Sequence, residues 1–92
     1  MLAKKFIISG IVQGVFFRKS TEEFVHTNLP NLKGYVKNLP TKQVEIYAIG
    51  SEEELVTLKE YLQEGPQAAT VEQVHEENSE FTQSYSTFSI IR

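Results

Sequence analysis

The segment from Gly10 to Arg18 (GIVQGVFFR) holds the residue types best suited to chemistry in this chain. Its two glycines interrupt an apolar stretch, which indicates unusual backbone conformations or a close approach to a neighbouring group. A strand that ends in such a turn before a helix points backbone N–H groups into one concavity at the positive end of the helix dipole. Arg18 at the helix start could add a bidentate guanidinium. These residues fit an anion site, but a pair of glycines near an arginine is a weak motif. The alternative is that Val12, Val15 and the phenylalanines are core and Arg18 is a surface charge.

Other catalytic side chains are scarce. His26 and His75 have no partner at metal-ligand spacing, so both are expected to be surface or packing residues. The chain has no cysteine, which excludes disulfides, thiolate nucleophiles and cysteine-ligated zinc. The serines lack an assignable base, and nothing selects a pair of carboxylates for acid–base work. We therefore expect no metal site and look to the loop for the chemistry.

Length and composition limit the kind of protein that this chain can form. Its 92 residues, 40% of them hydrophobic, predict one domain over residues 1–92 with a small core and a site on a surface loop. The net charge of −3, without a basic run, argues against a nucleic-acid partner. The apolar stretches are too short for a membrane span or a signal peptide, so the cytoplasm is the default compartment.

The pattern along the chain predicts two helices among five short strands. The first helix is expected from Phe17 to Asn28, or later if Ser20–Glu23 (STEE) forms a capping box. The second follows Ser51, where Glu54 completes a capping box ahead of a leucine stripe. The polar stretch Glu76–Ser84 reads as a loop. The expected strands are Lys4–Ser9, Lys33–Leu39, Gln43–Ile49, Ala69–His75 and Thr87–Ile91.

This order predicts an α+β two-layer sandwich (βαββαβ plus a short C-terminal strand), with both helices on one face of an antiparallel sheet. In the strand Gln43–Ile49, apolar residues alternate with Gln43, Glu45 and Tyr47, which predicts one buried and one wet face. Only a short connection, Pro40–Lys42, separates this strand from the one before it, so the two form a hairpin.

Two segments of the chain resemble known signatures. Gly10–Arg18 closely resembles the signature of the acylphosphatase family, and Gly34–Asn38 (GYVKN) resembles that family's second signature at about the expected distance. Gly50, Gly65-Pro66 and Phe88–Ile90 also match, so the resemblance covers almost the whole chain. The family's ferredoxin-like sandwich agrees with the element order obtained from the residue pattern.

The resemblance implies a hydrolase that cleaves acyl phosphates to a carboxylate and inorganic phosphate, without metal or cofactor, as a monomer. By position, Arg18 would bind the phosphoryl oxygens together with the loop amides from Gln13 to Arg18, and Asn38 would hold the attacking water. The phosphate-binding residues implied are Gln13, Gly14, Val15, Phe16, Phe17 and Arg18. Without the resemblance, Asn38 reads as an ordinary turn residue.

The sequence also departs from the family's pattern. Ile11 stands where many members carry a basic residue, which weakens the positive field of the loop. Tyr35 replaces a commoner tryptophan, and Pro40–Lys42 replaces an aspartate-glycine type of turn next to Asn38. The alternative function is a non-catalytic module on the same fold that binds an anion, or one that binds RNA through aromatics such as Phe6, Tyr35 and Tyr47.

Overall fold

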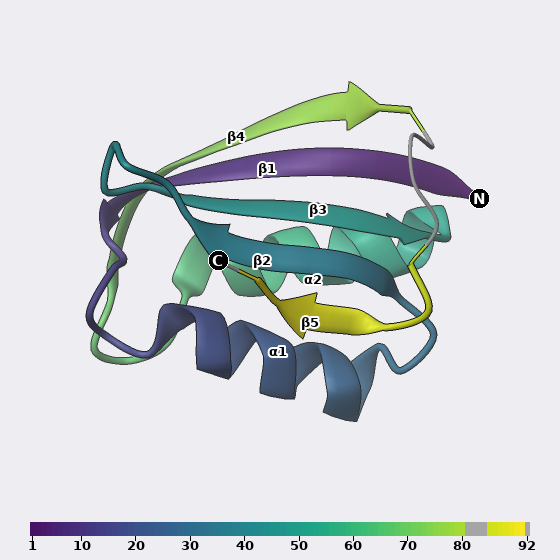
Figure 1. Ribbon diagram of the computed structural model, residues 1–92, viewed down its shortest axis with the longest axis horizontal. Coiled ribbons are helices and arrows are strands. Elements are labelled where there is room, and N and C mark those ends of the chain that lie inside the picture. Colours follow the sequence, from purple (N-terminus) through teal and green to yellow (C-terminus); the bar gives the residue numbers. More distant parts are fainter. Residues whose placement is uncertain (81–84, 92) are drawn as a thin grey trace.

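The computed structural model describes residues 1–80 and 85–91, and its element order is the predicted one (Figure 1). Every strand differs from its predicted bounds by at least one residue. Helix α1 ends at Asn28 as predicted and begins at Phe17, the earlier of the two starts that the sequence left open. The elements are β1 (Leu2–Ile11), α1 (Phe17–Asn28), β2 (Lys33–Asn38), β3 (Val44–Gly50), α2 (Glu52–Glu64), β4 (Thr70–Ser79) and β5 (Phe88–Ile90).

The strands form one sheet in the order β4-β1-β3-β2-β5. The pairs β1–β3, β1–β4 and β2–β3 are antiparallel, as expected for a ferredoxin-like sandwich. Strand β5 departs from the predicted antiparallel sheet because it runs parallel to β2, with Gly34 opposite Phe88 and Val36 opposite Ile90. Strands β4 and β5 lie at opposite edges of the sheet, and β5 runs in the direction of β2 (Figure 1).

Both helices cover the same face of the sheet, and the main core lies between these two layers (Figure 1). Alternate residues of the strands point into it, as the period of a strand requires. From the helices come Phe17 and Val25 of α1 and the leucine stripe of α2. The largest fully buried side chains include Phe6, Phe17, Phe88, Ile8, Leu32, Ile46, Leu58 and Leu62.

The two helices begin in different ways. Helix α2 has the predicted capping box, in which Glu54 N–H donates to Ser51 Oγ and Ser51 N–H donates to the Glu54 carboxylate. Helix α1 begins at Phe17 and not at a Ser20 cap. The Thr21 hydroxyl is buried and donates to the Phe17 carbonyl one turn earlier. Ser20–Glu23 therefore lie inside the helix and do not form a capping box at its start.

The outer face of the sheet carries a smaller cluster around Tyr47. Its ring is 4% exposed and stacks on Tyr35 at a centroid distance of 5.6 Å, with Tyr85 tilted against both. The predicted wet face of β3 is therefore wrong at Tyr47, because neighbouring aromatics shield it. Burial, together with the hydrogen bond to Glu45, raises the pKa of Tyr35 well above its ordinary range.

The same arrangement disfavours the RNA-binding alternative. Phe6 is 1% exposed and lies in the core under the helices, and the Tyr47 ring is covered. Stacking on single-stranded bases needs exposed rings, which these two residues do not offer. Of the described residues, none belongs to a helix long and apolar enough to cross a membrane.

Strand β4 is longer than predicted, because Glu76–Ser79 belong to it and not to a loop. Residues 81–84 of that predicted loop lie outside the described residues. Glu76–Ser79 are polar and have low strand propensity. They nevertheless extend β4, because they pair with β1, where Phe6 lies opposite Glu76. Glu76 forms ion pairs with Lys4 of β1 and with Lys59 of α2, the latter at 2.7 Å, and these hydrogen bonds hold the pKa of Glu76 below its usual value.

Replacing Glu76 by glutamine is expected to lower the free energy of unfolding at pH 7 by about 1 kcal/mol, since both cations lose their partner. A lowered folded-state pKa adds stability above the unfolded value of about 4.3, and that stability is lost as the pH falls through the folded value. Urea unfolding across this pH range should show the gap between wild type and E76Q closing in acid. A pH-independent gap would contradict the ion-pair origin. Glu72→Gln, at an exposed position of the same strand, is the matched control.

Candidate active site

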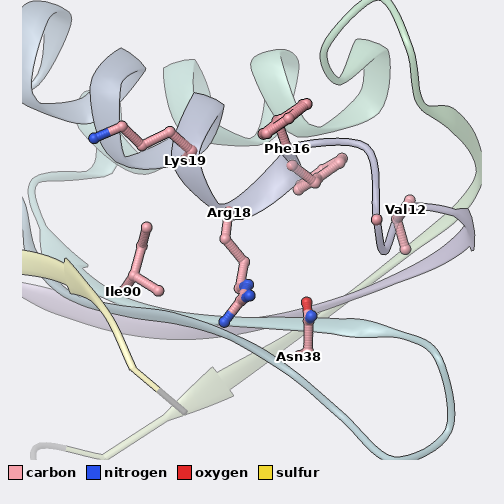
Figure 2. A pocket seen from close by; sticks show the side chains of 8 residues that line it. Val12, Phe16, Arg18, Lys19, Asn38 and Ile90 are labelled. Atoms are coloured by element: carbon pink, nitrogen blue, oxygen red, sulfur yellow. The ribbon is translucent and has the colours of Figure 1, made fainter.

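A cleft of about 370 Å³ lies where the β1–α1 loop and the start of α1 face the end of β2 (Figure 2). It combines the loop predicted to bind an anion with Asn38 of the second signature, which are far apart in the sequence. The residues that line it are Val12, Gly14, Phe16, Phe17, Arg18, Lys19, Asn38 and Ile90.

The two glycines have the two roles that the sequence left open. Gly10 has φ +130° where β1 bulges against β4, and a Cβ there would lie 2.1 Å from the Thr70 carbonyl oxygen. Gly14 has φ +74° with open space around it, so it is needed for its backbone angle alone. The left-handed conformation at Gly14 turns the chain from β1 toward α1.

The loop leaves a row of backbone donors free. In residues 1–80 and 85–91, the N–H groups of Gly14 to Arg18 donate to no backbone or side-chain acceptor. The first amides of a helix lack intrahelical partners, and the helix dipole adds partial positive charge at that end. This is the geometry that binds phosphate and related anions.

Arg18 lies within the first turn of α1, and its guanidinium extends across the cleft toward Asn38 (Figure 2). No acidic side chain in the described part of the chain forms an ion pair with it. Lys19 also lines the cleft, but its ammonium is mostly exposed and lies 3.9 Å from Glu22. Arg18 is therefore the cation best placed to meet an anion.

Asn38 is the last residue of β2, and its amide group points into the cleft (Figure 2). Its Oδ1 atom is buried and accepts no hydrogen bond from any described residue. Leaving a buried polar atom unpaired costs about 1–3 kcal/mol, so such atoms in native proteins call for an explanation. A ligand or a bound water in the cleft would satisfy this acceptor.

The Gln13 side chain connects the loop to the β2–β3 turn. Its Nε2 donates to the carbonyl oxygens of Leu39 at 2.9 Å and of Gln43 at 2.8 Å. The turn itself closes by a hydrogen bond from Lys42 N–H to Leu39 O, with Lys42 in the left-handed region at φ 68°. Because Leu39 follows Asn38 directly, Gln13 sets the position of the loop relative to Asn38.

The structure brings together most of the residues that the sequence singled out. Gly14, Phe16, Phe17, Arg18 and Asn38 line one cleft, whereas the Val15 side chain packs against the core and the Gln13 side chain faces the turn. The sequence reasoning missed Ile90, which reaches the cleft because β5 pairs with β2. No group of three or more histidines and carboxylates in the described residues is placed to hold a metal ion.

The fold and this cleft together define a small α+β protein with unpaired backbone amides and an arginine at a helix N-terminus, within the described residues. The family model described as acylphosphatase matches residues 4–90. A curated acylphosphatase of Vibrio cholerae is 47% identical over 88 residues, which cover 95% of this chain and 93% of that protein. One of Pasteurella multocida is 40% identical over 90 residues, covering 98% of each chain.

A solved structure supports the same family by its fold. The crystal structure of acylphosphatase from Bacillus subtilis superposes with a TM-score of 0.91 at 32% sequence identity, and the match covers 100% of both chains. The chain therefore belongs to the acylphosphatase family. It is an enzyme of the hydrolase class.

The link through Gln13 can be tested by changing its amide to a carboxylate. Gln13→Glu keeps the size of the side chain but replaces the donor by an acceptor that faces two carbonyl oxygens. We expect the free energy of unfolding to fall by about 1–3 kcal/mol, measured by urea denaturation.

Thr41→Val is the matched control, because Thr41 lies in the same turn and its exposed hydroxyl donates to the Gln43 side chain. It should change stability by less than about 0.5 kcal/mol. Equal stability of Gln13→Glu and wild type at neutral pH would show that the two hydrogen bonds do not hold the loop.

Proposed function

We propose that this enzyme hydrolyses acyl phosphates by in-line attack of water on phosphorus. The amides of Gln13 to Arg18 and the Arg18 guanidinium bind the phosphoryl group, and Asn38 orients the water. The observation that carries the proposal is the buried Asn38 Oδ1. Among the described residues it has no hydrogen-bond partner, and it shares a cleft with loop amides that donate to no acceptor there and with an arginine that has no acidic partner there.

The reaction suits a site without a strong acid or base. The bond between phosphorus and the carboxyl oxygen breaks, and its electron pair leaves with the carboxylate. A new bond forms between phosphorus and the water oxygen, and the water's proton passes to solvent. The leaving carboxylate has a conjugate acid of pKa about 4, so it departs without general-acid help. None of the described residues that line the cleft is a histidine, an aspartate or a glutamate, which fits this requirement.

The loop and Arg18 would stabilise the charge on the transferred group. Phosphoryl transfer gains mostly from positioning and from charge stabilisation at the equatorial oxygens. Backbone N–H groups fixed around the loop need no reorganisation during the reaction, which makes them effective donors. The guanidinium can bind two of these oxygens at once. These groups supply the positive charge that a metal ion supplies in other phosphoryl-transfer sites, so the proposed mechanism uses no cofactor.

Asn38 would fix the nucleophile. A water that donates one O–H to Oδ1 satisfies the buried acceptor and keeps a lone pair for phosphorus. Gln13 sets the distance between the loop and Leu39, the residue after Asn38. It would therefore fix the distance between the phosphoryl group and the water. A single chain over residues 1–92 supplies all of these groups, so we propose that one domain acts as a monomer on a small-molecule substrate.

Replacing Arg18 or Asn38 by alanine should separate phosphate binding from the positioning of water. Arg18→Ala is expected to lower kcat/KM for acetyl phosphate by about 10³-fold and to weaken inhibition by inorganic phosphate, since both need the guanidinium. Asn38→Ala should lower kcat by about 10²-fold or more while the inhibition constant for phosphate changes by less than about twofold.

Lys33→Ala removes a cation from the other end of β2 and serves as the control for a general loss of charge. Urea unfolding of each variant confirms that it folds. Full activity of both site variants would refute the proposal. Phosphate binding by wild type without any turnover would instead support the non-catalytic anion-binding alternative.

A further inference from the structure

Phe16 is an unfavourable residue for the position that it occupies. It is the N-cap of α1, where serine, threonine, asparagine or aspartate is preferred, and it makes no side-chain capping bond. Its backbone is left-handed, with φ 60° and ψ 25°, which costs a bulky residue about 1–2 kcal/mol. Its side chain is 82% exposed, so it gains little from burial.

None of these features stabilises the fold, and together they point to a function for the ring. A strained backbone that persists next to a binding site is a ground for a functional hypothesis. The Phe16 side chain borders the same cleft as Arg18 and Asn38, with Ile90 as a further apolar residue on its wall. An exposed aromatic ring beside an anion site suits a ligand that has a charged end and an apolar end.

The two ends of the cleft differ in character. Figure 2 shows Phe16 and Asn38 on opposite sides, with the Arg18 side chain extending between them. In an in-line reaction the water and the leaving group lie on opposite sides of phosphorus. With the water at Asn38 and the phosphoryl group at Arg18, the leaving acyl group extends toward Phe16.

We propose that the Phe16 ring binds the acyl group and makes the enzyme prefer acyl phosphates with an aromatic or extended apolar acyl chain. This inference rests on the proposed function, because the direction of the acyl group follows from the position of the water. The contact is made by the side chain of Phe16, whereas its role in phosphate binding is through the backbone amide. An acetyl group is too short to cover the ring, so the ring adds affinity only for larger substrates.

The test compares benzoyl phosphate with acetyl phosphate in wild type and two variants. Phe16→Ala and Phe16→Asn should each lower the ratio of kcat/KM for benzoyl phosphate to kcat/KM for acetyl phosphate by about tenfold. Asparagine tolerates the left-handed conformation and can cap a helix, so Phe16→Asn should also unfold at a higher temperature than wild type. Opposite changes in stability and selectivity are the signature of a side chain kept for binding.

Val56→Ala is the matched control, since Val56 is 53% exposed on α2 and lines no part of the cleft. It should leave the substrate ratio unchanged. An unchanged ratio in both Phe16 variants would overturn the inference, as would equal losses on the two substrates. Failure of the proposed function is seen separately, because it would appear as full hydrolysis of acetyl phosphate by Arg18→Ala and Asn38→Ala.

Discussion

The site depends on two hydrogen bonds from one side-chain amide. Gln13 Nε2 donates to the carbonyl oxygens of Leu39 and Gln43, and so fixes the β1–α1 loop against the β2–β3 turn. The loop carries the free amides, and Asn38 is adjacent to the turn. This link adds to the pairing of the strands and to the packing of α1 against β2, which also join the two halves of the site. The Gln43 side chain extends the network by donating to Ser9 Oγ in β1, so three segments around the cleft are connected.

The fold presents backbone N–H donors at the cleft and so needs few charged side chains there. The chain has a net charge of −3, yet the loop amides, the positive end of the α1 dipole and Arg18 all lie at the cleft. Two left-handed residues, Gly14 and Phe16, turn the loop so that its N–H groups stay unpaired within the described residues. In the proposed mechanism a shallow cleft is sufficient, because its rim would hold the phosphoryl group without enclosing it.

The sequence predicted what depends on local pattern. The leucine stripe and capping box of α2 and the end of α1 follow from residue types within one or two turns, and the structure confirms them. The local pattern left two starts for α1 open, and the structure selects Phe17. The predicted strand Ala69–His75 ends too early, because the residues after it, Glu76–Ser79, are polar. Their inclusion in β4 is explained by pairing with β1 and by the lysines around Glu76. The burial of Tyr47 and the position of Ile90 in the cleft depend on neighbours distant in sequence, so no local pattern shows them. The hydrogen bonds of the Gln13 side chain could not be predicted from local sequence either, because its partners lie 26 and 30 residues away.

The central claim is that the cleft holds the phosphoryl group and directs water at phosphorus. Single-turnover hydrolysis of acetyl phosphate in ¹⁸O-labelled water, with enzyme in excess, tests this claim most directly through the isotope content of the two products. The mechanism predicts that the label appears in inorganic phosphate and that the acetate carries none beyond the uncatalysed background. Label in the acetate would show attack at the carbonyl carbon. Asn38 and the loop could not then have the roles assigned to them.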